Sequence, residues 1–214
     1  MKALVTDCIK LVVITLVAGI ILGAVYGITK EPIAQQEMKA RQEAYKAVFP
    51  DASEFTDVEG FSEEEAADVL ADYSNVIEDH EGDLITAAVE AKDASGALLG
   101  YIFNVTTAKG YGGNIQLTVG IQADGTVNGY SVLSISETAG LGMNAKTNQA
   151  WADQYKNKKV DHFEVVKDGS GNLNSPSVEN PGIDAISGAT ITSKAVTGAM
   201  NSCLAYFQSL EGGN

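Results

Sequence analysis

The chain has 214 residues, of which 45% are hydrophobic, and its formal net charge at neutral pH is −14. The apolar content is enough for one buried core, whereas the acidity argues against nucleic acid as a partner, because phosphate backbones are bound by clustered Lys and Arg. The two cysteines, Cys8 and Cys203, lie near opposite ends without a C-x-x-C pair. A disulfide framework, an iron–sulfur cluster or a c-type haem held by this chain alone is therefore not expected. His80 and His162 lack the spacing of metal ligands, so no metal site is expected either.

An uncharged apolar run occupies residues 11–29. As a helix it would reach about 28 Å, close to the hydrocarbon thickness of a bilayer. A secretory signal peptide is the alternative, but the run is long for such a segment and no A-x-A cleavage site follows. We therefore expect residues 1–30 to form a retained, single-pass membrane anchor. Lysines flank the run on both sides, so the charge pattern does not decide its orientation.

Residues 31–60 are expected to form a juxtamembrane helix and its connection to the domain that follows. Pro32 suits the first turn of this helix, and Pro50 is expected to end it. Ser62 and Glu65 have the spacing of a capping box, which predicts the start of another helix. The remaining residues, 61–214, are expected to form the main domain.

Four segments of this domain are rich in β-branched and aromatic residues and predict strands, namely 83–91, 97–107, 114–122 and 126–136. The sequence Ala-Asp-Gly at 123–125 predicts a hairpin turn between the last two. Since the connections are short, the sheet is expected to be antiparallel. Residues 144–155 predict a short helix and 160–172 a strand running into a polar loop. Apolar residues at helical spacing from Thr190 to Phe207 predict an amphipathic C-terminal helix laid on the sheet, which makes the fold class α+β.

The start of this last helix carries the sequence DAISGATITS, residues 184–193. Ser187 is expected to be the N-cap, which places Thr190 near the third helical position. The free backbone amides and positive dipole of such a helix end suit a phosphate group, and the small residues Gly188 and Ala189 would let a bulky ligand approach. These residues alone fit an ordinary capped helix start equally well.

Two further motifs accompany this one: GYGG at 110–113, just before a strand, and ETAGLG at 137–142, just after one. Together with the anchor, the three motifs resemble the covalent FMN-binding subunits of ion-translocating redox complexes. The chain is most similar to the G subunit of Rnf-type ferredoxin:NAD oxidoreductases, and the C subunit of the sodium-pumping NADH:quinone oxidoreductases is the alternative. The family usually has a proline where this chain has Ala139, and often a histidine where it has Ile135.

The resemblance implies that FMN is joined through its phosphate to the hydroxyl of Thr190. It also implies that a separate flavin transferase makes this bond from FAD and reads Asp184. The loop that carries the ETAGLG motif is expected to lie against the flavin ring, and Tyr111 is expected either to stack on the ring or to be a buried structural residue. The residues expected to bind the cofactor are thus Thr190, Ser187, Gly188, Ala189, Asp184, Glu137, Thr138, Gly140, Leu141 and Tyr111.

The implied function is electron relay within a membrane complex, without catalysis by this chain alone. Its implied partners are other membrane, iron–sulfur and flavin subunits, and its soluble domain is expected on the extracytoplasmic side. Two other functions remain open on the sequence: an anchored binding or sensor module without redox chemistry, and a free-standing flavin reductase. A colourless purified protein would favour the first, and turnover without partner subunits would favour the second.

Overall fold

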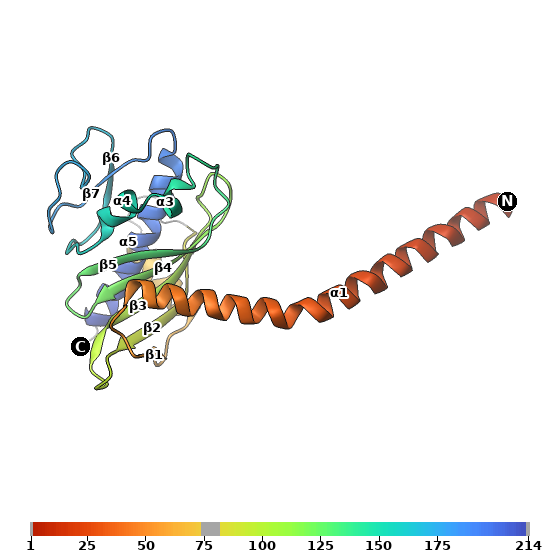
Figure 1. The fold of residues 1–214 in the computed structure, drawn as a ribbon, viewed down its shortest axis with the longest axis horizontal. Coiled ribbons are helices and arrows are strands. Elements are labelled where there is room, and N and C mark those ends of the chain that lie inside the picture. Colours follow the sequence, from red (N-terminus) through yellow and green to blue (C-terminus); the bar gives the residue numbers. More distant parts are fainter. Residues whose placement is uncertain (1, 74–81, 213–214) are drawn as a thin grey trace. The chain divides into compact units, whose positions relative to one another are not determined.

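The computed structural model describes residues 2–73 and 82–212 (Figure 1). His80, for which no metal-binding role is expected, lies outside the described residues. The chain divides into two compact units, Met1–Gln42 and Glu43–Asn214.

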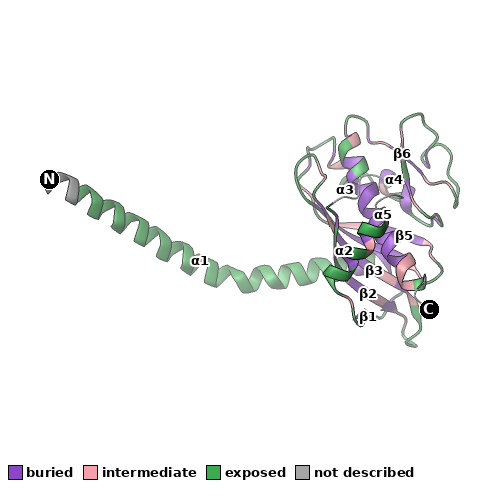
Figure 2. Ribbon diagram, turned by 180° about the vertical axis from the view of Figure 1, so that it is seen from behind, coloured by how far each residue is buried: buried purple, intermediate pink, exposed green. Residues whose placement is uncertain are grey.

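The described residues of the first unit all belong to helix α1 (Lys2–Val48). Its side chains from Thr6 onward are exposed (Figure 2), including apolar ones on every side of the helix such as Leu11, Ile14 and Leu22. A helix that is apolar all round is typical of a membrane span. This helix is long and apolar enough to cross a bilayer, with a mean hydropathy of 2.6 in its most apolar window.

The expected helix start at Pro32 is wrong, because α1 continues through this residue and ends at Val48, two residues before Pro50. A proline inside a helix removes one backbone hydrogen bond and crowds the preceding turn, at a cost of about 3 kcal/mol. Strong helix formers such as Ala, Gln, Glu and Lys follow it, and they favour continuation. The end before Pro50 is confirmed.

The second unit is built on a five-stranded antiparallel sheet in which each strand pairs with its neighbours in sequence. The strands are β1 (Glu54–Asp57), β2 (Leu84–Lys92), β3 (Leu98–Thr107), β4 (Ile115–Gln122) and β5 (Val127–Ser134). All four predicted strands and the antiparallel arrangement are confirmed, whereas β1 was not predicted. Gly125, with φ +86°, allows the predicted hairpin between β4 and β5, and its N–H donates to the carbonyl oxygen of Gln122 over 2.9 Å.

Two longer helices pack against this sheet. Helix α2 (Glu63–Asp72) has the predicted N-cap, since Ser62 Oγ accepts from the Glu65 amide over 3.1 Å. Helix α5 (Thr190–Gly212) lies on β3 and β4, as predicted, and Figure 2 shows its inner face buried. The core between helix and sheet contains fully buried apolar side chains from both, among them Leu117, Val119, Val196, Met200 and Leu204.

The segment between the sheet and α5 is more broken than the sequence predicted. In place of one helix over 144–155 there are α3 (Asn144–Thr147), α4 (Gln149–Ala152) and a 3₁₀ turn, η2 (Asp153–Tyr155). Asn148 causes the break: its backbone is extended, and its side chain accepts from the Trp151 amide to begin α4. A short parallel pair follows, with the predicted strand β6 (Glu164–Val166) beside β7 (Gly182–Asp184), which was not predicted.

Candidate functional site

The turn between β7 and α5 differs from the sequence prediction. The Ala189 amide donates to the Ile186 carbonyl oxygen over 2.9 Å, and Gly188 has φ +74°, which is the pattern of a type II β-turn. The helix itself begins at Thr190, so the expectation that Ser187 is its N-cap is wrong. Because the turn reverses the chain after Ser187, this exposed residue stands three positions before the helix and does not cap its amides.

The N-terminus of α5 has no side-chain cap within the part of the chain that the structure describes. The first intrahelical bond runs from the Ser193 amide to the Ala189 carbonyl oxygen, over 3.0 Å. Among described residues, nothing accepts from the amides of Thr190, Ile191 and Thr192. Three backbone donors and the positive end of the helix dipole are therefore free to bind an anion.

A cavity of about 630 Å³ opens at this helix end, between the turn before β4, the loop after β5 and the start of α5. Seven of the ten residues that the sequence assigned to cofactor binding line it together: Tyr111, Glu137, Thr138, Leu141, Gly188, Ala189 and Thr190. Three lining residues were not predicted: Gly142, Ile191 and Thr192. Their signal was present in the sequence, since Gly142 ends the ETAGLG motif and Ile191 and Thr192 belong to the DAISGATITS motif.

The carboxylate of Glu137 joins two of these segments and, with the Gly113 carbonyl oxygen and Thr192 Oγ1, leaves no room for a Cβ at a glycine of each. It is buried, and its Oε1 accepts from the Gly112 amide over 3.2 Å. A Cβ at Gly110 would stand 2.8 Å from Oε1, and one at Gly142 would stand 2.6 Å from Oε2. No side chain fits at either position without moving the carboxylate, so the GYGG and ETAGLG motifs are two halves of one packing arrangement.

The loop after β5 keeps its shape without the proline that is usual in the family. The Leu141 amide donates to the Thr138 carbonyl oxygen over 3.1 Å, and Gly140 has φ +76°. This again is the pattern of a type II turn, and Ala139 occupies its second position, where proline is favoured but not required. Ile135, at the place of the family's histidine, is half-buried and packs against the core.

Three exposed residues at the mouth of the cavity have large apolar or aromatic side chains. Tyr111 is 72% exposed, so the alternative of a buried structural tyrosine is wrong, and Leu141 and Ile191 are 42% and 53% exposed. Among the described residues that line the cavity, Glu137 is the one carboxylate, and none is Lys or Arg. A bound phosphate would therefore meet backbone amides and no cationic side chain.

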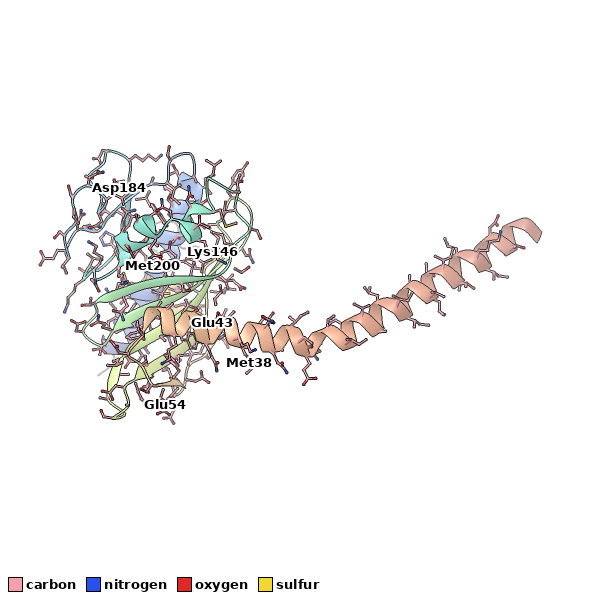
Figure 3. All side chains as sticks on the ribbon, viewed as in Figure 1. Met38, Glu43, Glu54, Lys146, Asp184 and Met200 are labelled. Carbon is pink, nitrogen blue, oxygen red and sulfur yellow. The ribbon has the colours of Figure 1, made fainter. Side chains whose placement is uncertain are left out.

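Three of the ten predicted residues do not line the cavity: Ser187, Gly140 and Asp184. Asp184, labelled in Figure 3, ends β7 and is buried. Its Oδ2 accepts from the Leu173 amide over 2.9 Å, and its backbone carbonyl accepts from Trp151 Nε1 over 2.7 Å. In the folded domain Asp184 thus holds the loop that precedes β7.

Comparison with known proteins agrees with this geometry. The model of the FMN-binding domain family matches residues 110–205, which include all three motifs. The G subunit of the proton-translocating ferredoxin:NAD(+) oxidoreductase complex of Clostridium ljungdahlii is 32% identical over 95% of this chain and 91% of its own length. The chain belongs to the G-subunit family of these complexes.

Two further similarities accompany it. The G subunit of the Na(+)-translocating ferredoxin:NAD(+) oxidoreductase complex of Acetobacterium woodii is 30% identical over 94% of this chain and 89% of its own length. The crystal structure of NqrC from Shewanella oneidensis is 25% identical and covers 59% of this chain and 61% of that chain, with a TM-score of 0.45. Membership in the G-subunit family rests on the relatives that match along nearly their full length.

Proposed function

We propose that this chain carries FMN in covalent linkage to Thr190 and relays electrons within an ion-translocating ferredoxin:NAD oxidoreductase complex. The observation that carries the proposal is the uncapped start of α5 at a cavity built from all three family motifs. The apolar mouth at Tyr111, Leu141 and Ile191 suits a flat aromatic ring, and the free amides suit its phosphate.

The exposure of the side chains favours Thr190 over the neighbouring hydroxyl residues as the attachment site. Thr192 and Ser193 are 1% and 0% exposed, so neither hydroxyl is open to an external enzyme in the folded domain. Ser187 is exposed but does not line the cavity. Thr190 alone among these four is both partly exposed and part of the cavity wall.

The attachment reaction uses FAD as the donor and a flavin transferase as the catalyst. The Thr190 oxygen forms a bond to the phosphorus of the FMN half, the diphosphate P–O bond breaks, and AMP leaves while the hydroxyl proton passes to solvent. FMN, once bound, supplies the redox chemistry. The chain supplies the anchoring oxygen of Thr190, the three free amides for the phosphate, and the loop pinned by Glu137. A phosphate at this helix end would do what an N-cap side chain does elsewhere, a contribution of about 1 kcal/mol.

Covalent linkage suits a carrier whose cofactor must stay with it at an open cavity. As an electron carrier without a dissociating substrate, the chain needs an electron donor and an electron acceptor beside it in the membrane. We place the domain on the extracytoplasmic side, supported by the family resemblance. Protease added to intact, wall-stripped cells should digest the domain, and protection there with digestion in inside-out vesicles would refute this placement.

The direct test is mass spectrometry of the tryptic peptide 168–194 from full-length protein made together with an active flavin transferase. The peptide should carry FMN less one water, localised to Thr190 by fragmentation. Thr190→Ala should give a folded, colourless protein, whereas Thr190→Ser retains a hydroxyl and should still accept FMN. An unmodified wild-type peptide would refute the covalent linkage, and modification of Thr192 would refute only the choice of residue.

A further inference from the structure

Ser193 bonds backward to the turn that precedes its own helix. It is the fourth residue of α5 and fully buried. Its Oγ accepts from the Ile186 amide over 2.9 Å and donates to the Ala189 carbonyl oxygen over 3.0 Å. Ile186 and Ala189 are the first and last residues of the type II turn, so this one hydroxyl bridges both ends of it.

We infer that Ser193 is a positioning residue for cofactor attachment, an inference that rests on the function proposed above. Thr190 follows Ala189 directly, so the place of its hydroxyl depends on this turn. Apart from Ser193, the turn is closed by the single bond from the Ala189 amide to Ile186. Without the Ser193 hydroxyl, the amide of buried Ile186 has no acceptor among the described residues, and the chain must shift to find one.

A shift of this kind affects attachment far more than folding. Group transfer requires the attacking oxygen in line with the phosphorus, and a displacement of about 1 Å can slow such a reaction about a hundredfold. The folded domain, by contrast, rests on the large core between α5 and the sheet.

The same helix contains a matched control. Ser202 is also fully buried and, like Ser193, donates to the carbonyl four residues earlier, that of Gly198 over 3.1 Å. Its second partner is the Asp83 carboxylate, at 2.9 Å, instead of the turn before the helix. Ser202→Ala thus removes a buried hydroxyl of the same kind without touching the segment that presents Thr190.

The experiment measures the rate at which full-length protein in detergent accepts FMN from FAD and purified flavin transferase, followed by peptide mass spectrometry. Each rate is divided by the folded fraction, measured from the fluorescence of the chain's single tryptophan, Trp151. We expect Ser193→Ala to react about ten- to a hundredfold more slowly, and Ser202→Ala to react at the wild-type rate. A wild-type rate in Ser193→Ala, or an equal loss in Ser202→Ala, would overturn the inference.

A second variant keeps the test decisive if Ser193→Ala does not fold. Ser193→Cys preserves the volume of the side chain but replaces the hydroxyl by a thiol, a much weaker hydrogen-bonding group. It should also attach FMN slowly, and a wild-type rate would overturn the inference. If the proposed function itself is wrong, the result differs from these outcomes, because the wild-type protein would then accept no FMN.

Discussion

Removing the Glu137 carboxylate should loosen the site by a predictable amount. Glu137→Ala takes the acceptor away from the Gly112 amide and empties the space that Gly110 and Gly142 leave for it. A hydrogen bond to a charged group contributes about 1.5–3 kcal/mol, and the space left by the buried Glu137 side chain adds to the loss. We expect the free energy of unfolding to fall by about 2–3 kcal/mol, which lowers Tm by roughly 4–12 °C in a domain of this size.

Glu137→Gln separates shape from charge. Its carbonyl oxygen can accept from Gly112 as Oε1 does now, and its NH₂ group would face the side where Oε2 and Thr192 Oγ1 both approach Gly142. This variant should stay within about 1 kcal/mol of wild type. The assay is urea unfolding of the full chain in detergent, followed by the fluorescence of Trp151, which is 2% exposed. A loss below about 0.5 kcal/mol for Glu137→Ala would refute the pinning role, and an equal loss for both variants would show that the charge matters and the shape does not.

Three further predictions concern the surroundings of the site. Ala139→Pro should raise the free energy of unfolding by about 0.4–1 kcal/mol, because proline suits the second position of the type II turn and restricts the unfolded chain; a lower midpoint in urea would contradict the assigned turn. Asp184→Ala should speed proteolysis within residues 168–182, because the Leu173 amide loses its acceptor, whereas Glu179→Ala, at an exposed acid of the same loop, should have little effect; equal cleavage of the two variants would contradict this role. Burial raises the pKa of Tyr155, so wild-type stability should fall above about pH 10 as the unfolded phenol ionises and the buried one does not. Tyr155→Phe should cost about 0.5–1.5 kcal/mol at neutral pH, through its lost bond to Thr197, and that difference should shrink in urea unfolding above about pH 10; a constant difference would contradict the assignment.

The sheet could be predicted from sequence because its signals are local. The alternation in the segments of β2 to β5, the Ala-Asp-Gly turn and the Ser62 cap all act within a few residues. Strands β1 and β7 have four and three residues and owe their conformation to pairing with distant strands. Such short segments carry too little periodicity to be recognised alone.

The sequence predicted seven of the residues that line the cavity, but not the contacts that bring them together. Three motifs far apart in sequence do meet at one cavity, yet their meeting depends on Glu137, whose partners no local pattern reveals. Asp184 was assigned to the helix mouth, whereas the unpredicted β7 turns it toward Leu173.

The start of α5 at Thr190, without Ser187 as its N-cap, is consistent with the phosphate site proposed above. A helix of 23 residues normally begins with a side chain that satisfies its first amides, and Ser187 was the natural candidate. The chain instead turns at Gly188, begins the helix at Thr190 and leaves three amides without a side-chain acceptor in the described structure. A protein that capped this helix by itself would compete with the phosphate for the same donors. The missing cap is therefore what an anion site requires, and Ser193, which would otherwise be an ordinary helical serine, fixes the turn that keeps those donors free.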